Sequence, residues 1–317
     1  MRRPTTTDLY VMAWRHTRRL PDPLVRGAAH LVADVVWLAR TAGVQQLSRN
    51  LARLRPDLDA RALRRTTRAG MRSYLRYFVE AFQLPGWSPE QIDARVRATG
   101  TEHVRGVIDA GESLVLALGH TGNWDLAGAW ASRHLGPVLT VAEKLPDGLY
   151  EEFVAFRNSL GIEIVPLEGG TTFRRLTRLA KAKPQLVPLL ADRDLTAHGV
   201  EVDLRGAPAR VAAGPATLAL VGGHALLPAA LSYERLRGER RRRAGTPWGL
   251  LIEFGEPVAT RTPDGARRDV TAVTQDWVTA LFTAVARKPQ DWHMLQKVFL
   301  ADLDPARLSD VPRAEEV

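Results

Sequence analysis

The sequence predicts an α/β fold with a single, largely parallel central sheet flanked by helices, preceded by an amphipathic helical region. Two observations lead to this prediction. Apolar residues recur at helical spacing through the N-terminal quarter of the chain. From Thr101 onward, short apolar runs alternate with helical segments. Such alternation is typical of parallel strands joined by helical crossovers.

The N-terminal region is predicted to be helical over residues 8–53 and to be broken by Pro21 and Pro23. Several arginines occur near aromatic residues there, namely Arg15, Arg18, Arg19 and Arg26 near Tyr10, Trp14 and Trp37. A basic amphipathic helix pair can lie in the headgroup layer of a membrane. The alternative is that these helices pack on the domain and expose their arginines to water.

A further helix is predicted over residues 60–82, and the alternation follows it. Predicted strands are residues 113–118, 138–141, 162–166, 186–190, 225–233 and 248–254. Predicted helices are residues 123–134, 147–160, 172–182, 214–221 and 270–287. The arginine-rich residues 234–245 are predicted to form an exposed hairpin loop. The chain thus divides into membrane-associating helices (1–60), an α/β domain (61–304) and a disordered tail (305–317).

Composition narrows the class of protein. The 317 residues are 45% hydrophobic, which suits a sizeable core, and no cysteine is present, which excludes disulfides, thiolate catalysis and cysteine-based zinc sites. The formal net charge of +9 predicts an anionic partner. Nucleic acid, anionic lipid headgroups and a phosphate-bearing co-substrate all fit. No nucleic-acid-binding motif is present, so we expect a lipid or co-substrate.

No segment is predicted to span a bilayer. The best candidate, residues 24–39, falls short of the roughly 20 apolar residues required and carries Arg26, His30 and Asp34. The N-terminus has charged residues but no apolar run and no cleavage site. We therefore expect a protein that stays in the cytoplasm, on the membrane surface.

The motif Gly119-His120-Thr121-Gly122-Asn123-Trp124-Asp125 follows a predicted buried strand and opens a helix. Ligands of an open α/β sheet bind beyond the carboxyl ends of its strands. The spacing predicts that the Asp125 carboxylate accepts the Nδ1 hydrogen of His120, which leaves Nε2 free to act as a general base. Gly119 and Gly122 would let backbone and ligand approach closely.

The spacing alone is a weak signal, because His198 and Asp203 repeat it within a loop-to-strand passage. The strand-to-helix setting and the glycines distinguish the first pair. The alternative for that pair is structural, with Asp125 capping a helix beside a packed histidine.

These residues resemble the bacterial lipid A lauroyl/myristoyl acyltransferase superfamily, and more closely its phosphatidylinositol mannoside acyltransferase branch. The similarity extends along most of the chain. Its other blocks are Arg49-Asn50-Leu51-Ala52-Arg53, Ala142-Glu143-Lys144-Leu145, residues 156–161, residues 190–195, residues 199–203, Ala213-Gly214-Pro215-Ala216 and Pro289-Gln290-Asp291-Trp292.

The resemblance implies transfer of a fatty acyl group, expected to be palmitoyl, from acyl-CoA to a mannose hydroxyl of phosphatidylinositol mannoside. The enzyme would be peripheral, at the cytoplasmic face of an anionic inner membrane. No metal and no redox cofactor is expected, because a thioester is already activated. Alternatives are a lysophospholipid, glycerolipid or lipid A type of acceptor, an acyl carrier protein as donor, and a non-enzymatic basic peripheral membrane protein.

The resemblance also implies a third acid that pairs with an arginine near the histidine. The matching positions are Asp192 and Arg157, with Asp194 as the alternative acid. The expected catalytic residues are therefore His120, Asp125 and Asp192, and the expected substrate-binding residues are Thr121, Asn123, Arg157, Arg193 and His198. Arg157 and Arg193 also have structural interpretations, as a helix-terminal cation and as an ion-pair partner. We take Trp292 as a core residue.

Overall fold

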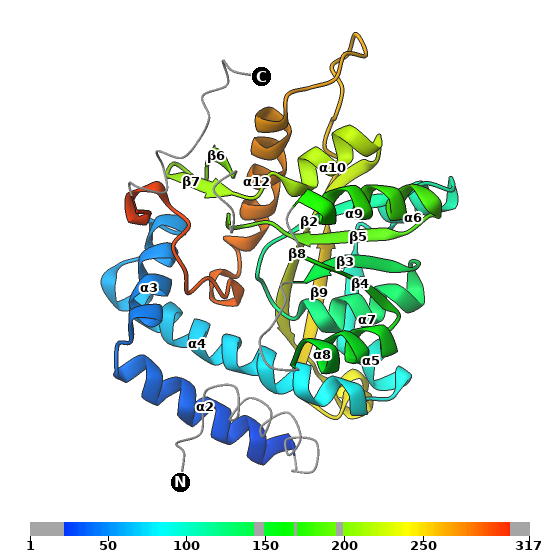
Figure 1. Ribbon diagram of the computed structural model, residues 1–317. Coiled ribbons are helices and arrows are strands. Elements are labelled where there is room, and N and C mark those ends of the chain that lie inside the picture. Colours follow the sequence, from blue (N-terminus) through cyan, green and yellow to red (C-terminus); the bar gives the residue numbers. More distant parts are fainter. Residues whose placement is uncertain (1–21, 143–148, 168–169, 195–198, 305–317) are drawn as a thin grey trace.

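The computed structural model describes residues 22–142, 149–167, 170–194 and 199–304 (Figure 1). The predictions for residues 1–21, for His198 and for the tail at 305–317 lie outside these ranges. A seven-stranded sheet forms the centre, in the order β1-β9-β8-β2-β5-β3-β4, and helices cover both of its faces. The predicted fold class is confirmed.

Five neighbouring strands of the sheet are parallel to one another: β8 (Ala225–Arg235), β2 (Leu114–Leu118), β5 (Leu186–Leu190), β3 (Val138–Ala142) and β4 (Ile162–Pro166). β9 (Trp248–Phe254) runs antiparallel to β8, and β1 (Val96–Thr99) pairs parallel to β9. The strand β1 was not predicted, because its four residues, Val-Arg-Ala-Thr, contain no continuous apolar run. A separate hairpin of β6 (Val200–Asp203) and β7 (Pro208–Val211) was also missed as such.

The core lies on both faces of the sheet. All five residues of β2 are buried. Leu114, Leu116 and Leu118 belong to the core on one face, whereas Val115 and Ala117 belong to the core on the other. Alternate side chains of a strand point to opposite faces, so a central strand with helices on both sides must be apolar throughout. This explains why β2 was recognisable from sequence.

Six helices of the domain follow the predicted order: α4 (Ala60–Gln83), α7 (Trp124–His134), α8 (Leu149–Ser159), α9 (Gly170–Ala182), α10 (Gly214–Gly222) and α12 (Val270–Val285). Two further short helices, α5 (Pro89–Arg95) and α6 (Thr101–Asp109), were not predicted. Single 3-10 turns occur at Leu84–Gly86, Pro289–Asp291 and Leu300–Asp302. The segment predicted as a hairpin loop does join two antiparallel strands, but it contains a short helix, α11 (Gly238–Ala244).

The N-terminal region forms α2 (Asp22–Leu38) and α3 (Ala42–Leu54). The break between them was not predicted; Arg40 adopts a left-handed conformation there, with φ 48°. The α3 residues Leu47, Leu51 and Leu54 are fully buried in one of the two sheet cores. By contrast, α2 packs on α4 and leaves large apolar side chains exposed, at Leu24, Leu31, Val32, Val35 and Leu38. Among the described helices, none has the length and apolar character needed to cross a bilayer.

Candidate active site

The sheet register brings two distant segments together at its carboxyl edge. β2 and β5 are adjacent and parallel, with Leu118 opposite Leu190. The residues that follow the two strands therefore emerge side by side. His120 comes from the first segment and Asp192 from the second. This edge is where ligands bind in open α/β sheets.

The partner of His120 is Asp192. Its carboxylate Oδ1 lies 2.5 Å from Nδ1 of the imidazole, and Oδ2 accepts the backbone N–H of His120 at 2.8 Å. An ionised carboxylate can only accept, so Nδ1 carries the proton and Nε2 is left as the basic nitrogen. The prediction that Asp125 accepts the Nδ1 hydrogen is therefore wrong. Of the two candidate acids, Asp192 contacts His120, whereas Asp194 contacts Gly199 and Arg210.

Asp192 receives one further hydrogen bond, from the indole N–H of Trp292 to Oδ2 at 2.8 Å. The carboxylate is fully buried. Burial by itself raises the pKa of Asp192, but the charge of His120 and the hydrogen bonds from His120 and Trp292 outweigh it, and the pKa is lowered overall. The carboxylate is thus held ionised beside the imidazole.

Asp125 has a different role in the structure. Its Oδ1 accepts a hydrogen bond from Arg157 Nε at 2.7 Å, and its Oδ2 accepts one from the Tyr77 hydroxyl at 3.0 Å. Both members of the ion pair are buried. The first turn of α7 directs the side chain toward α8 and α4, away from the Nδ1 side of His120. Arg157 was expected to pair with the third acid; it pairs with Asp125 instead.

Two residues expected to bind substrate lie in the interior. Thr121 is 1% exposed, and its hydroxyl contacts the Gly119 carbonyl and the Leu231 N–H at 3.4 Å each. Asn123 is fully buried; it caps α7 by accepting from the Leu126 N–H and donates to Glu80. Neither side chain lines the cavity in front of His120. They hold the loop that carries the histidine, so their assignment to substrate binding is corrected.

Two backbone N–H groups of the loop after His120 already donate hydrogen bonds within the protein. The Thr121 N–H donates to the Gly119 carbonyl at 2.7 Å, and the Gly122 N–H donates to the Asp291 carbonyl at 2.9 Å. Gly122 has φ 54°, and a Cβ there would lie 3.0 Å from Leu231, so the turn requires glycine.

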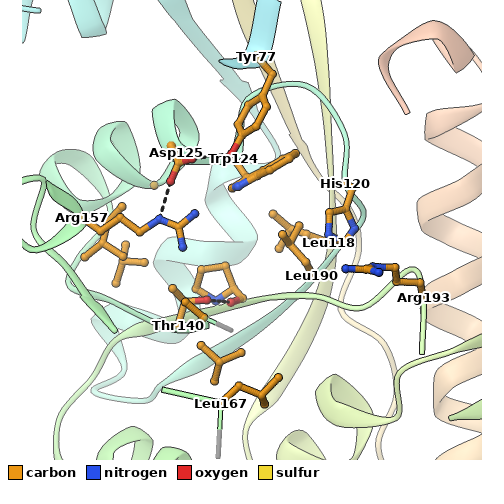
Figure 2. A pocket seen from close by; sticks show the side chains of 16 residues that line it. Tyr77, Leu118, His120, Trp124, Asp125, Thr140, Arg157, Leu167, Leu190 and Arg193 are labelled. Atoms are coloured by element: carbon orange, nitrogen blue, oxygen red, sulfur yellow. Dashed lines mark hydrogen bonds and ion pairs between the residues drawn. The ribbon is translucent and has the colours of Figure 1, made fainter. Parts of the chain in front are cut away.

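A cavity of about 280 Å³ opens beside His120 (Figure 2). Arg157 and Arg193 line it from opposite sides, and the guanidinium of Arg193 is directed toward the imidazole. Apolar residues form much of the rest, namely Leu118, Val138, Ile162, Leu167, Pro188 and Leu190. The cavity therefore combines the imidazole of His120, the guanidinium groups of Arg157 and Arg193, and an apolar wall.

The remaining candidates lie elsewhere. Asp194 accepts the Gly199 N–H and lies 3.6 Å from Arg210, away from His120. His198 lies outside the described residues. Its motif partner Asp203 is exposed at the end of β6, where its carboxylate accepts the Gly206 N–H. Asp203 therefore takes no part in the cavity that opens beside His120.

Sequence reasoning missed the contribution of the segment that follows α12. Asp291, Trp292 and His293 are buried behind His120, and the His293 N–H donates to the His120 carbonyl at 2.8 Å. The Pro-Gln-Asp-Trp block had been noted only as a resemblance. The sequence signal for this segment was the pair Asp291 and Trp292, a charged and a large aromatic residue next to each other outside any predicted helix.

His293 makes the fold sensitive to acid. Burial, and next the charge of Arg76, lower the pKa of His293 to about 3. A histidine in the unfolded chain has a pKa of about 6.5, so the unfolded state binds an extra proton between these two values, and stability falls as the pH drops through that window.

We expect His293→Gln to flatten this dependence by at most about 1.4 kcal/mol per pH unit, the slope for one proton. The buried carboxyls of Glu80 and Asp291 have raised pKa values, which act in the opposite direction, and they are present in both proteins. Urea unfolding of both proteins between pH 7 and pH 4 measures the difference. Equal slopes would contradict the assignment.

Comparison with known proteins identifies the class. The family model for bacterial lipid A biosynthesis acyltransferases matches residues 1–301, and the chain belongs to this family. The protein is an acyltransferase that acts on a lipid, as the resemblance predicted. The alternative of a non-enzymatic peripheral protein is thereby excluded.

Its relatives narrow the comparison. The phosphatidylinositol mannoside acyltransferase of Mycolicibacterium smegmatis is 39% identical over 306 residues, covering 95% of this chain and 94% of the relative. The protein of the same name from Mycobacterium tuberculosis is 38% identical over 309 residues, covering 96% and 92%. The crystal structure of a 1-acyl-sn-glycerophosphate acyltransferase from Thermotoga maritima aligns with a TM-score of 0.40 and 13% identity, covering 86% of this chain and 98% of that one.

Proposed function

We propose that the protein transfers a fatty acyl group, palmitoyl in the first instance, from acyl-CoA to a mannose hydroxyl of phosphatidylinositol mannoside, with His120 as general base. The observation that carries the proposal is the pair of His120 and a buried Asp192 at a cavity with an apolar wall. The relatives' names support the acceptor. Within this proposal the third acid is Asp192, acting through His120.

The proposed reaction needs one proton carrier. Nε2 of His120 removes the proton from the acceptor hydroxyl as its oxygen attacks the thioester carbonyl carbon. The C–S bond then breaks, and the leaving thiolate takes the proton back from Nε2. Asp192 keeps the other ring nitrogen protonated and stabilises the transient imidazolium, as the aspartate does in a serine-hydrolase triad.

Two adjoining cavities support the proposal that the transferred acyl chain is long. A smaller cavity of about 30 Å³ shares Leu118, Gly128, Val138 and Pro188 with the one beside His120 and lies between α7 and the sheet, reaching Ile252 and Phe254. Its accessible lining is entirely apolar. Burying a methylene group contributes ~0.8 kcal/mol, so a chain that fills both spaces binds more tightly than a short one.

We expect Gly128→Leu to lower kcat/KM for palmitoyl-CoA far more than for octanoyl-CoA. Gly128 lines both cavities, and a Cβ there already lies 2.8 Å from Ile162 Cδ1. A leucine would therefore occupy the space of the chain. Gly106→Leu is the matched control, since it is the same glycine-to-leucine change in a helix, α6, and a Cβ at this position meets no atom of the described residues within 4 Å. An equal loss for both donors would place the acyl chain elsewhere.

We further propose that the enzyme works at the cytoplasmic face of the inner membrane. The exposed apolar side chains belong to a helix, α2, that packs against α4, and Arg61, Arg64 and Arg65 of α4 line a surface pocket together with Trp37 of α2. Arg241, Arg242 and Arg243 of α11 are exposed as well. A hydrogen bond of 2.6 Å from Arg26 to Thr246 ties α2 to the end of α11. Apolar side chains together with cations suit an anionic lipid surface, where each arginine contributes roughly 1 kcal/mol.

An acceptor assay tests the function. The purified protein is given palmitoyl-CoA with a mannosylated phosphatidylinositol, a lysophospholipid or a lipid A precursor, and products are identified by mass spectrometry. We expect acylated mannoside from the wild type and from His134→Ala, a surface histidine control, and none above background from His120→Ala. If only another acceptor were acylated, the proposed mannoside acceptor would be wrong. Full activity of His120→Ala would overturn the assignment of His120 as the general base.

A further inference from the structure

Trp292 touches the same carboxylate that holds His120, although it comes from the far end of the chain. Its indole is fully buried, and Nε1 donates to Asp192 Oδ2 at 2.8 Å. The same oxygen accepts the His120 backbone N–H, while Oδ1 faces Nδ1 of the ring. The indole is thus the one donor in this set that does not belong to His120 itself.

The segment that carries Trp292 is hydrogen-bonded through its backbone to the loop that carries His120. Thr121 and Trp292 form an antiparallel bridge. The Gly122 N–H donates to the Asp291 carbonyl, and the His293 N–H donates to the His120 carbonyl. The Asp291 side chain in turn accepts from the Ser73 hydroxyl at 2.6 Å and from the Tyr233 N–H at 2.9 Å. The indole therefore has a fixed position relative to both His120 and Asp192.

We propose that Trp292 is a positioning residue for the acyl transfer, acting through Asp192. The terminal torsion of an aspartate is broad, so a carboxylate without fixed donors can rotate about it. With the indole N–H and the His120 N–H both on Oδ2, rotation costs two hydrogen bonds, and Oδ1 stays on Nδ1. Gly119 leaves room for this arrangement, because a Cβ there would lie 3.1 Å from Oδ2. The inference rests on the proposed role of His120 as general base.

Trp292 also packs in the core, where its ring meets Phe282 edge-on at 5.2 Å. A second tryptophan separates the two contributions. Trp277 lies in α12 and is fully buried in the same core, and its Nε1 has no hydrogen-bond partner among the residues that the structure describes. Replacing either residue with phenylalanine removes the same atoms from the same core. Only at position 292 does the change remove a hydrogen bond.

The experiment compares Trp292→Phe with Trp277→Phe. We expect Trp292→Phe to lower kcat about 10- to 100-fold, the effect of one hydrogen bond to a charged group, while KM for palmitoyl-CoA stays close to the wild-type value. The acid limb of its pH profile should move to higher pH, because the Asp192 carboxylate loses a donor. Trp277→Phe should keep the wild-type kcat and pH profile. Equal kcat values and equal pH profiles in the two variants would overturn the proposal.

A spectroscopic readout separates this proposal from the function itself. In protein labelled with ¹⁵N-histidine, the Nδ1 proton of His120 should resonate at low field in the wild type and in Trp277→Phe, and should move or broaden in Trp292→Phe. That result stands even if mannoside acylation fails, and an unchanged resonance would overturn the positioning role even if acylation succeeds. If Trp292→Phe does not fold, site-specific benzothienylalanine at position 292 keeps the shape without the N–H, and the same outcomes apply.

Discussion

Asp192→Asn is expected to lower turnover by a factor on the order of 10²–10⁴, the range for disabling a general base. Oδ2 of the carboxylate accepts two N–H groups, from His120 and Trp292. The oxygen of an asparagine amide must take that position, which turns its NH₂ group toward Nδ1. The imidazole then has to accept at Nδ1 and carry its proton on Nε2, the nitrogen that should receive the proton of the acceptor hydroxyl.

Single-turnover kinetics with saturating palmitoyl-CoA measure this effect on the chemical step. Asp194→Asn is the matched control, because Asp194 lies two residues away on the same segment and contacts Gly199 and Arg210 rather than His120. We expect that variant to retain near wild-type turnover. If Asp125→Asn were as inactive as Asp192→Asn while remaining equally stable, the assignment of Asp192 as the acid that orients His120 would be refuted.

Asp125→Ala is expected to cost about 3–5 kcal/mol of the free energy of unfolding, the usual result of removing one partner of a buried ion pair. Arg157 and Asp125 are both more than nine-tenths buried, and the Tyr77 hydroxyl loses its acceptor as well. Turnover at saturating substrate should fall less than in Asp192→Asn, because Asp125 does not touch the imidazole.

Denaturant titration provides the measurement, with Asp93→Ala as the control. Asp93 pairs with Arg133 at 3.6 Å and with His134 at 2.7 Å on the surface, so its removal should cost at most about 1 kcal/mol. Substituting Arg157 with methionine in addition to Asp125→Ala should restore part of the loss, since no buried cation then remains at this position. A loss for Asp125→Ala no larger than for Asp93→Ala would show that the buried pair does not stabilise the fold.

Much of the fold could be predicted from the sequence, for a physical reason. The central strands β2 and β5 are buried on both faces, so they are short continuous apolar runs, and the helices between them carry one apolar side. The elements that escaped prediction, namely β1, α5, α6, α11 and the β6–β7 hairpin, are all short. β1 is four residues long at the edge of the sheet, and α11 is a seven-residue helix made mostly of arginine.

His120, the proposed general base, could be placed from sequence because its position depends on local structure. A buried strand ends at Leu118, Gly122 turns the chain, and Asn123 caps the next helix, so His120 must stand at the carboxyl edge of the sheet. The resemblance added Asp192 and Arg157 to the candidate residues. It paired those two with each other, whereas the structure pairs each with a residue of the motif itself.

The sequence by itself therefore determined the class of fold, the position of His120 and the set of charged residues around it. Only the tertiary structure decided which acid meets which base. Asp125 is five residues from His120 but begins a helix that carries its carboxylate toward Arg157. Asp192 is 72 residues away but leaves a strand hydrogen-bonded alongside β2. Spacing along the chain fixes direction only within one element, whereas contacts across a sheet depend on strand order and register.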